Sequence, residues 1–199
     1  MSPCLLTRFR LSFIVALLAA CALNVSATPA KESPKMDWWL EARCGMFVHF
    51  GLYSTAARHE KVIRNERMSP EQYRVYFDLF EPDLLDMREW ITTAKKAGFK
   101  YVVLTAKHHD GFCLWDTAET DYKITNTLYG RDLIQEFVDM CAEEGMRVGL
   151  YYSIIDWRHP DFSIDDRHAL RHLPNRDELN EGCDMGRYRS YMQRQLEEL

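Results

Sequence analysis

The sequence lacks several features that would place it in a class at once. Its 25 Lys and Arg residues against 30 Asp and Glu residues give a formal net charge of −5. Without a basic patch, nucleic acid is not an expected partner. None of its six cysteines stands in a CxxC pair, the spacing typical of structural zinc sites. With 47% hydrophobic and 28% charged residues, the composition is that of a globular protein.

Long apolar runs are also missing. The run over residues 11–23 is too short for a transmembrane span. It follows two arginines and precedes a small-residue cleavage pattern that ends at Ala27, which is typical of a secretory signal peptide. The sequence therefore predicts a signal peptide over residues 1–27, a linker over 28–37, and export to the periplasm or the cell exterior.

The cysteines leave two alternatives open. Residues 18–21 resemble a bacterial lipobox, in which Cys21 would become the mature N-terminus and carry a lipid anchor. Export would also permit disulfides. Cys44 and Cys141, however, lie in apolar periodic segments, so we expect both to be buried thiols that pack as small hydrophobic residues.

Alternating strand and helix patterns follow the linker. Three short, largely apolar segments predict buried strands of a parallel sheet, at residues 45–50, 101–106 and 148–153. Apolar residues with helical spacing predict helices over about 70–79, 87–97, 133–144 and 186–199. We expect Asp83 or Asp86 to cap the second of these helices, and Gly98 and Gly145 to follow the ends of the second and third.

The connections between these segments differ in length. Each helix reaches the next strand through about two residues, whereas each strand reaches its main helix through a long segment. This inequality is typical of a (β/α)8 barrel, whose sites gather at the C-terminal ends of the strands. A glycine-rich turn after the first strand, which a dinucleotide-binding fold would need, is absent. A complete barrel takes about 250 residues, so we expect an incomplete (β/α)8 TIM barrel with about three βα units over residues 38–199.

Polar and aromatic side chains follow the ends of all three predicted strands. They are His49 after the first strand, His108, His109 and Asp110 after the second, and Tyr152, Asp156 and Trp157 around the third. Imidazole and phenol groups supply the donors and acceptors that sugar hydroxyls require. Trp115 or Trp157 could supply an aromatic wall for the apolar face of a pyranose.

The same histidines permit a second interpretation, a metal-dependent hydrolase. Adjacent side chains on an extended backbone point in opposite directions, which separates His108 from His109. The first strand also offers only His49, where metal-dependent barrel hydrolases typically have His-x-His. We therefore predict neither a metal nor a cofactor, and keep the metal-dependent hydrolase as an alternative.

Three segments carry a specific resemblance. The stretch from Trp38 to Ser54, WWLEARCGMFVHFGLYS, resembles the opening of the family 29 α-L-fucosidases. AKHHDGFCLWD, from Ala106 to Asp116, is similar to the most recognisable motif of that family, and GLYYS followed by Asp156-Trp157 to its third-strand segment. The resemblance implies a TIM-barrel glycosidase that releases terminal α-L-fucose from fucosylated glycans with retention of configuration and without a cofactor.

The resemblance also implies roles for individual residues. The substrate-binding residues that the resemblance implies are His49, Glu66, His108, His109 and Tyr152, and Trp115 joins them as the candidate for the aromatic wall. Glu66 matches more loosely, since the family more often has Trp in the place of Arg67. The family's nucleophile is an Asp on a later strand and its acid/base generally lies later still, so both are expected beyond Leu199. If this chain is the whole product, the alternative function is non-catalytic carbohydrate binding.

Overall fold

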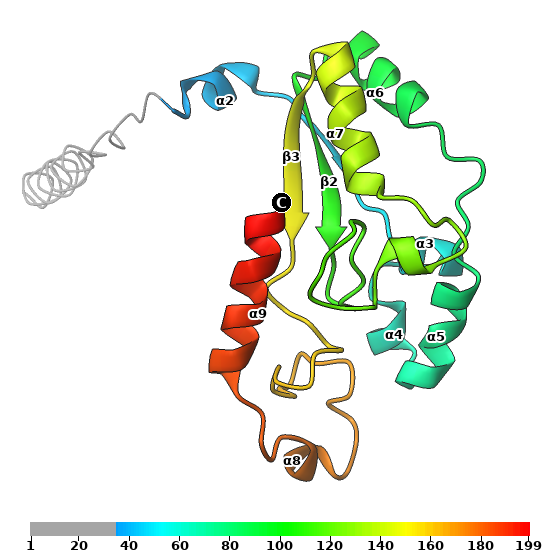
Figure 1. Ribbon diagram of the computed structural model, residues 1–199, viewed down its shortest axis with the longest axis vertical. Coiled ribbons are helices and arrows are strands. Elements are labelled where there is room, and N and C mark those ends of the chain that lie inside the picture. Colours follow the sequence, from blue (N-terminus) through cyan, green and yellow to red (C-terminus); the bar gives the residue numbers. More distant parts are fainter. Residues whose placement is uncertain (1–34) are drawn as a thin grey trace, which may run out of the picture. The chain divides into compact units, whose positions relative to one another are not determined.

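The computed structural model describes residues 35–199 (Figure 1). The predicted signal peptide, Cys21 and the predicted linker up to residue 34 lie outside the described residues. The chain divides into one unit that ends at Glu41 and a second that runs from Ala42 to Leu199. The described part of the first unit is residues 35–41, which include all but the last residue of helix α2 (Asp37–Ala42). All further elements belong to the second unit.

A parallel three-stranded sheet forms the centre of the second unit. Its strands are β1 (Met46–Val48), β2 (Tyr101–Lys107) and β3 (Arg147–Tyr152), in the order β1-β2-β3. Phe47 lies opposite Val103, and Val103 lies opposite Gly149. The three predicted strands and their parallel arrangement are confirmed, although β1 is shorter than predicted.

One face of this sheet is packed and the other is open. Val102, Leu104 and Ala106 of β2 are fully buried and share one apolar core with helices α6 (Met87–Lys96) and α7 (Leu133–Glu144). On the opposite face, the Phe47 side chain is 53% exposed. Figure 1 shows α6 and α7 side by side along the sheet. All three strands are predicted to be buried, but only β2 contains fully buried residues, because β1 and β3 are the edges of the described sheet.

Local sequence signals set the helix boundaries. The carboxylate of Asp86 accepts a hydrogen bond from the Glu89 backbone N–H at 2.8 Å and caps α6, which confirms the second of the two predicted caps. Gly145 ends α7 in the left-handed region, with φ 66°. Helices α5 (Pro70–Asp78) and α9 (Met185–Glu198) also lie within a residue or two of their predicted positions.

The long connections contain short elements that the sequence pattern did not predict. The first loop holds α3 (Leu52–Ala56) and α4 (Val62–Asn65) before α5, the second holds the 3₁₀ turn Ile124–Asn126, and the third holds α8 (Arg176–Leu179). All three loops lie at the arrowhead ends of the strands in Figure 1. A small parallel sheet with helices and long loops at one end is compatible with part of a barrel.

The cysteine predictions have a mixed outcome. Cys141 is buried on α7, as predicted, but Cys44 is exposed. Cys44 precedes β1, outside the apolar core between the sheet and helices α6 and α7, so its thiol is exposed to solvent. All four cysteines within residues 35–199 are free thiols. None of the helices in this part of the chain is long and apolar enough to cross a membrane.

Candidate functional site

Three predicted site residues meet at the C-terminal ends of β1 and β2. The imidazole of His108 lies 4.6 Å from that of His49 and 4.2 Å from that of His109, measured between ring centroids. His49 is exposed, His109 is half-buried and His108 is buried. We call these three residues the histidine cluster. Parallel strands end at the same edge of a sheet, which explains why residues 60 positions apart in sequence become neighbours.

Three further aromatic rings enclose the histidine cluster. The Tyr53 ring of α3 lies 5.1 Å from His49 and 5.2 Å from His108. The Tyr151 ring lies 6.0 Å from His108, and Trp157 lies 5.1 Å from His109. Tyr53 and Tyr151 do not belong to the predicted site residues. Both residues lie in segments that carry the family resemblance, Tyr53 in residues 38–54 and Tyr151 in the GLYYS segment. Those segments are the sequence features that could have indicated them.

The cluster histidines are uncharged near neutral pH. Burial, followed by the neighbouring His109 and His49, lowers the pKa of His108 to about 3. Burial is also the largest cause of the lowered pKa values of His49 and His109. A neutral imidazole carries one hydrogen-bond donor and one acceptor, which suits the hydroxyl groups of a sugar.

The hydrogen bonds around His109 indicate its tautomer. Its Nδ1 lies 2.6 Å from the Ser153 hydroxyl oxygen, and that hydroxyl donates its single hydrogen to the Ile155 carbonyl at 2.7 Å. Nδ1 of His109 must therefore carry the hydrogen of this contact, which leaves Nε2 as an acceptor. In the described residues, the buried side-chain atoms without a hydrogen-bond partner are His108 Nδ1 and Trp157 Nε1, and both belong to this site.

A carboxylate outside the prediction acts on the cluster. Glu60 raises, and Lys61 lowers, the pKa values of all three cluster histidines, in each case as secondary effects after burial. These two residues form an ion pair of 3.3 Å. The predicted Glu66 instead accepts a hydrogen bond of 2.9 Å from Arg58, whose guanidinium also donates to Tyr76. Glu60 thus influences the charge of the cluster, whereas Glu66 pairs with Arg58. The sugar contact predicted for Glu66 stays a prediction.

This difference leads to a test with a matched pair of variants. In the complete protein, Glu60→Gln should lower the pKa values of the cluster histidines, because the Glu60 charge raises all three. Glu66→Gln should leave these pKa values unchanged, since Glu66 pairs with Arg58. NMR titration of the histidines measures both. A shift in Glu66→Gln as large as that in Glu60→Gln would contradict this expectation.

Tyr152 and Trp115 lie apart from the histidine cluster. The register shifts between Thr105 and Lys107, so that Tyr152 pairs with Lys107. The Tyr152 hydroxyl donates to the Gln195 side chain of α9 at 2.7 Å. Trp115 is 4% exposed, and its indole N–H donates to Glu198 at 2.8 Å. Successive strand side chains point to opposite faces, so Tyr151 lies near the cluster while Tyr152 faces Lys107 and Trp115.

The acidic residues near the motifs are committed to other partners. Asp110 accepts from the Tyr73 hydroxyl at 2.7 Å and from the Phe112 backbone N–H, and its burial raises its pKa to about 6. Asp156 pairs with Lys107 at 2.9 Å, and Asp116 pairs with Lys123. None of these three carboxylates is free to act as a nucleophile in this arrangement. Within residues 35–199, no three His, Cys, Asp or Glu side chains are grouped as metal ligands would be.

A cavity of about 620 Å³ lies among the three long loops. The histidines of the cluster do not line it, but Trp157 does. Its other walls include Tyr73, Asp110, Tyr122, Arg158 and Tyr191. Trp157 is therefore a shared wall between the histidine cluster and this cavity.

Comparisons with known proteins identify relatives over most of the chain. The family model described as Alpha-L-fucosidase matches residues 14–199. Alpha-L-fucosidase isoenzyme 1 from Paenibacillus thiaminolyticus is 48% identical, with a TM-score of 0.79 over 83% of this chain and 39% of that chain. A GH29 α-L-fucosidase from Bacteroides thetaiotaomicron, solved as a trapped covalent intermediate, is 30% identical, with a TM-score of 0.72 over 85% of this chain and 39% of that chain.

A curated relative has a similar extent. Tissue alpha-L-fucosidase of Rattus norvegicus is 31% identical over 184 residues, which cover 79% of this chain and 40% of the rat protein. The chain therefore spans about two fifths of the length of these relatives.

Proposed function

Because this chain belongs to the alpha-L-fucosidase family, we propose that the protein of which it forms part releases terminal α-L-fucose from fucosylated glycans. The observation that carries the proposal is the histidine cluster, three neutral imidazoles enclosed by Tyr53, Tyr151 and Trp157 at the ends of parallel strands. Neutral donors and acceptors beside aromatic faces match a deoxy sugar, which has both hydroxyl groups and apolar surface. The three strands are proposed as the first three of a (β/α)8 barrel.

We propose a retaining mechanism. Retention needs a nucleophilic carboxylate and an acid/base carboxyl group about 5–5.5 Å apart. The trapped covalent intermediate of the Bacteroides relative supports this choice. Asp110, Asp116 and Asp156 are held by other partners, so we place both catalytic carboxyl groups in the part of the protein that follows Leu199. The described residues bind and orient the sugar: Nε2 of His109 accepts a hydroxyl hydrogen, and the aromatic rings exclude water.

The stereochemistry of the product tests this proposal. The complete protein should hydrolyse an aryl α-L-fucoside and release the α-anomer of fucose first, as followed by proton NMR before mutarotation. Initial release of the β-anomer would contradict the retaining mechanism. Binding of fucose without hydrolysis would instead favour the non-catalytic carbohydrate-binding alternative.

We also propose that the protein is exported through the signal peptide of residues 1–27. The proposal rests on the sequence pattern alone. Mass spectrometry of the mature N-terminus distinguishes the outcomes. A terminus at Thr28 supports export as a free protein, a lipid-modified Cys21 supports the anchored form, and an intact Met1 contradicts both.

A further inference from the structure

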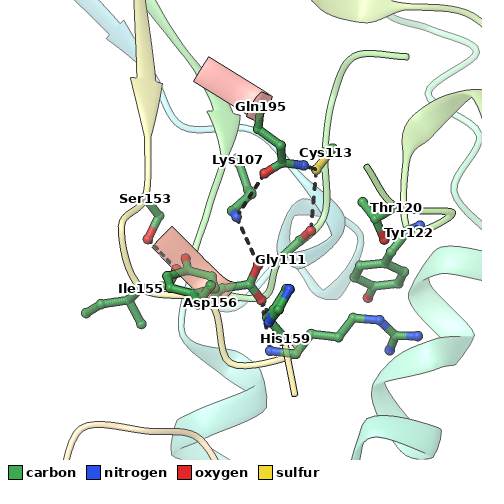
Figure 2. A network of polar contacts seen from close by, with 12 residues as sticks. Lys107, Gly111, Cys113, Thr120, Tyr122, Ser153, Ile155, Asp156, His159 and Gln195 are labelled. Carbon is green, nitrogen blue, oxygen red and sulfur yellow. Dashed lines mark hydrogen bonds and ion pairs between the residues drawn. The ribbon is translucent and has the colours of Figure 1, made fainter. Parts of the chain in front are cut away.

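Lys107 is a fully buried cation next to the histidine cluster. It precedes His108 and His109 directly, and its side chain is 0% exposed. Figure 2 shows its Nζ within the network formed by Asp156 and Gln195. Nζ donates to the Asp156 carboxylate at 2.9 Å, to the Tyr152 hydroxyl at 3.0 Å and to the Gln195 amide oxygen at 3.2 Å. One ammonium group therefore joins the end of β2, the third loop and α9.

Asp156 extends this connection into the third loop. Its second carboxylate oxygen accepts from the backbone N–H groups of Arg158 and His159, both at 3.0 Å, and so fixes the turn around Trp157. The same oxygen approaches the second loop so closely that a Cβ on Gly111 would lie 2.5 Å from it. Gly111 has φ +78°, a conformation that side chains disfavour. The carboxylate thus lies in close contact with the second loop at Gly111.

His109 takes its orientation from the third loop. The Ser153 hydroxyl oxygen accepts from its Nδ1, and the Trp157 backbone N–H donates to its carbonyl at 2.8 Å. Ser153 is itself fixed, because its backbone N–H donates to the Lys107 carbonyl at 3.0 Å. The contacts that set the tautomer and the ring position of His109 therefore come from a loop that Lys107 and Asp156 tie to β2.

From these contacts we infer that the Lys107 side chain is a positioning residue for the proposed fucosidase reaction, acting through Asp156 and the third loop on His109. Replacing a buried ion pair by apolar groups is often neutral or stabilising, so stability alone is a weak reason for one. Its geometry is better explained by specificity, since one ammonium group binds the third loop through Asp156 while it also binds Tyr152 of β3 and Gln195 of α9. The inference rests on the proposed function for its kinetic consequences, but the position of His109 is measurable independently.

The test compares Lys107→Met with Lys95→Met in the complete protein. Lys95, in the last turn of α6, also donates from Nζ to a carbonyl, that of Glu144, but is exposed. Lys107→Met should lose at least tenfold in kcat/KM for an aryl α-L-fucoside, and Lys95→Met should not change it. Lys107→Arg, which keeps a cation near Asp156, should recover part of the loss.

The pH profile separates positioning from general destabilisation. His109 faces Ser153 and Trp157 of the third loop, His49 and His108 of the cluster, and Glu60 and Lys61 of the first loop. Burial is the main cause of its lowered pKa. A loosened third loop would admit water, so the His109 pKa should rise toward 6.5 in Lys107→Met. The acidic limb of kcat/KM and the NMR titration of His109 should both move to higher pH.

Ser153→Ala is a second variant, which tests the role of the third loop even if Lys107→Met does not fold. It leaves the buried ion pair intact and removes the contact with His109 Nδ1, so it should shift the His109 titration without a large fall in melting temperature. A folded Lys107→Met with wild-type kcat/KM and an unchanged His109 titration would overturn the inference, as would an unchanged titration in Ser153→Ala. Absence of fucose release by the wild type would instead count against the proposed function.

Discussion

The His109→Ala variant of the complete protein should lose about a hundredfold in kcat/KM for an aryl α-L-fucoside. A desolvated hydrogen bond left without its partner costs about 1–3 kcal/mol, and about 1.4 kcal/mol corresponds to a factor of ten. The His109 ring also packs between the rings of His108 and Trp157, with centroid distances of 4.2 and 5.1 Å, so its removal changes the wall of the site. We therefore expect a loss near the upper end of the range of about 1–3 kcal/mol. Steady-state kinetics and a thermal melt measure the effect.

His172→Ala is the matched control. His172 lies on the third loop, is exposed, and contacts the Ala169 carbonyl rather than the cluster. It should leave kcat/KM unchanged. A large fall in the melting temperature of His109→Ala, with normal kinetics in the folded fraction, would assign His109 a structural role instead.

Residues 28–199 expressed alone should neither release fucose nor melt cooperatively. Phe47 is 53% exposed on the sheet face opposite the helices, and β1 and β3 are the edges of the described sheet. Burial of apolar surface contributes about 25 cal/mol per Å², whereas a domain is stable by only about 5–15 kcal/mol. An uncovered sheet face therefore removes a large part of the stability, and unpaired edges promote aggregation.

Circular dichroism, dye binding to exposed apolar surface, and size-exclusion chromatography measure these properties against the complete protein. A soluble monomer with a sharp melting transition would contradict the folding prediction. Fucose release above background would contradict the placement of the nucleophile after Leu199.

The sheet and its main helices could be predicted because their signals are local. The apolar strand runs, the Asp86 cap and Gly145 each act within one turn or one strand, and each lies where the pattern indicates. The short helices α3 and α4 could not be predicted in this way. A helix of four or five residues has little stability of its own, and tertiary contacts decide it.

In the site, too, the contacts set by strand ends could be predicted, whereas the contacts set by register and loop path could not. His49, His108 and His109 follow strand ends, so the parallel sheet alone brings them together. The register shift beside Lys107 places Tyr151 next to the cluster and Tyr152 against Lys107, and no sequence pattern reveals that shift. The pairing of Glu66 with Arg58 likewise depends on the path of the first loop.

The burial of uncharged histidines also makes the stability of the fold depend on pH, because the unfolded chain binds protons more readily than the folded chain. The pKa of His108 falls to about 3 and that of His168, a second buried histidine, to about 4, both mainly through burial. Between about pH 6.5 and 4, both histidines therefore become protonated in the unfolded chain but stay neutral in the folded chain. The free energy of unfolding falls as the pH falls through this range. Asp110, with its pKa raised to about 6, acts in the opposite direction over part of this range. The lowered histidine pKa values outnumber the single raised carboxyl pKa, so these groups leave a net uptake of protons on unfolding, and mild acid shifts the folding equilibrium toward the unfolded state.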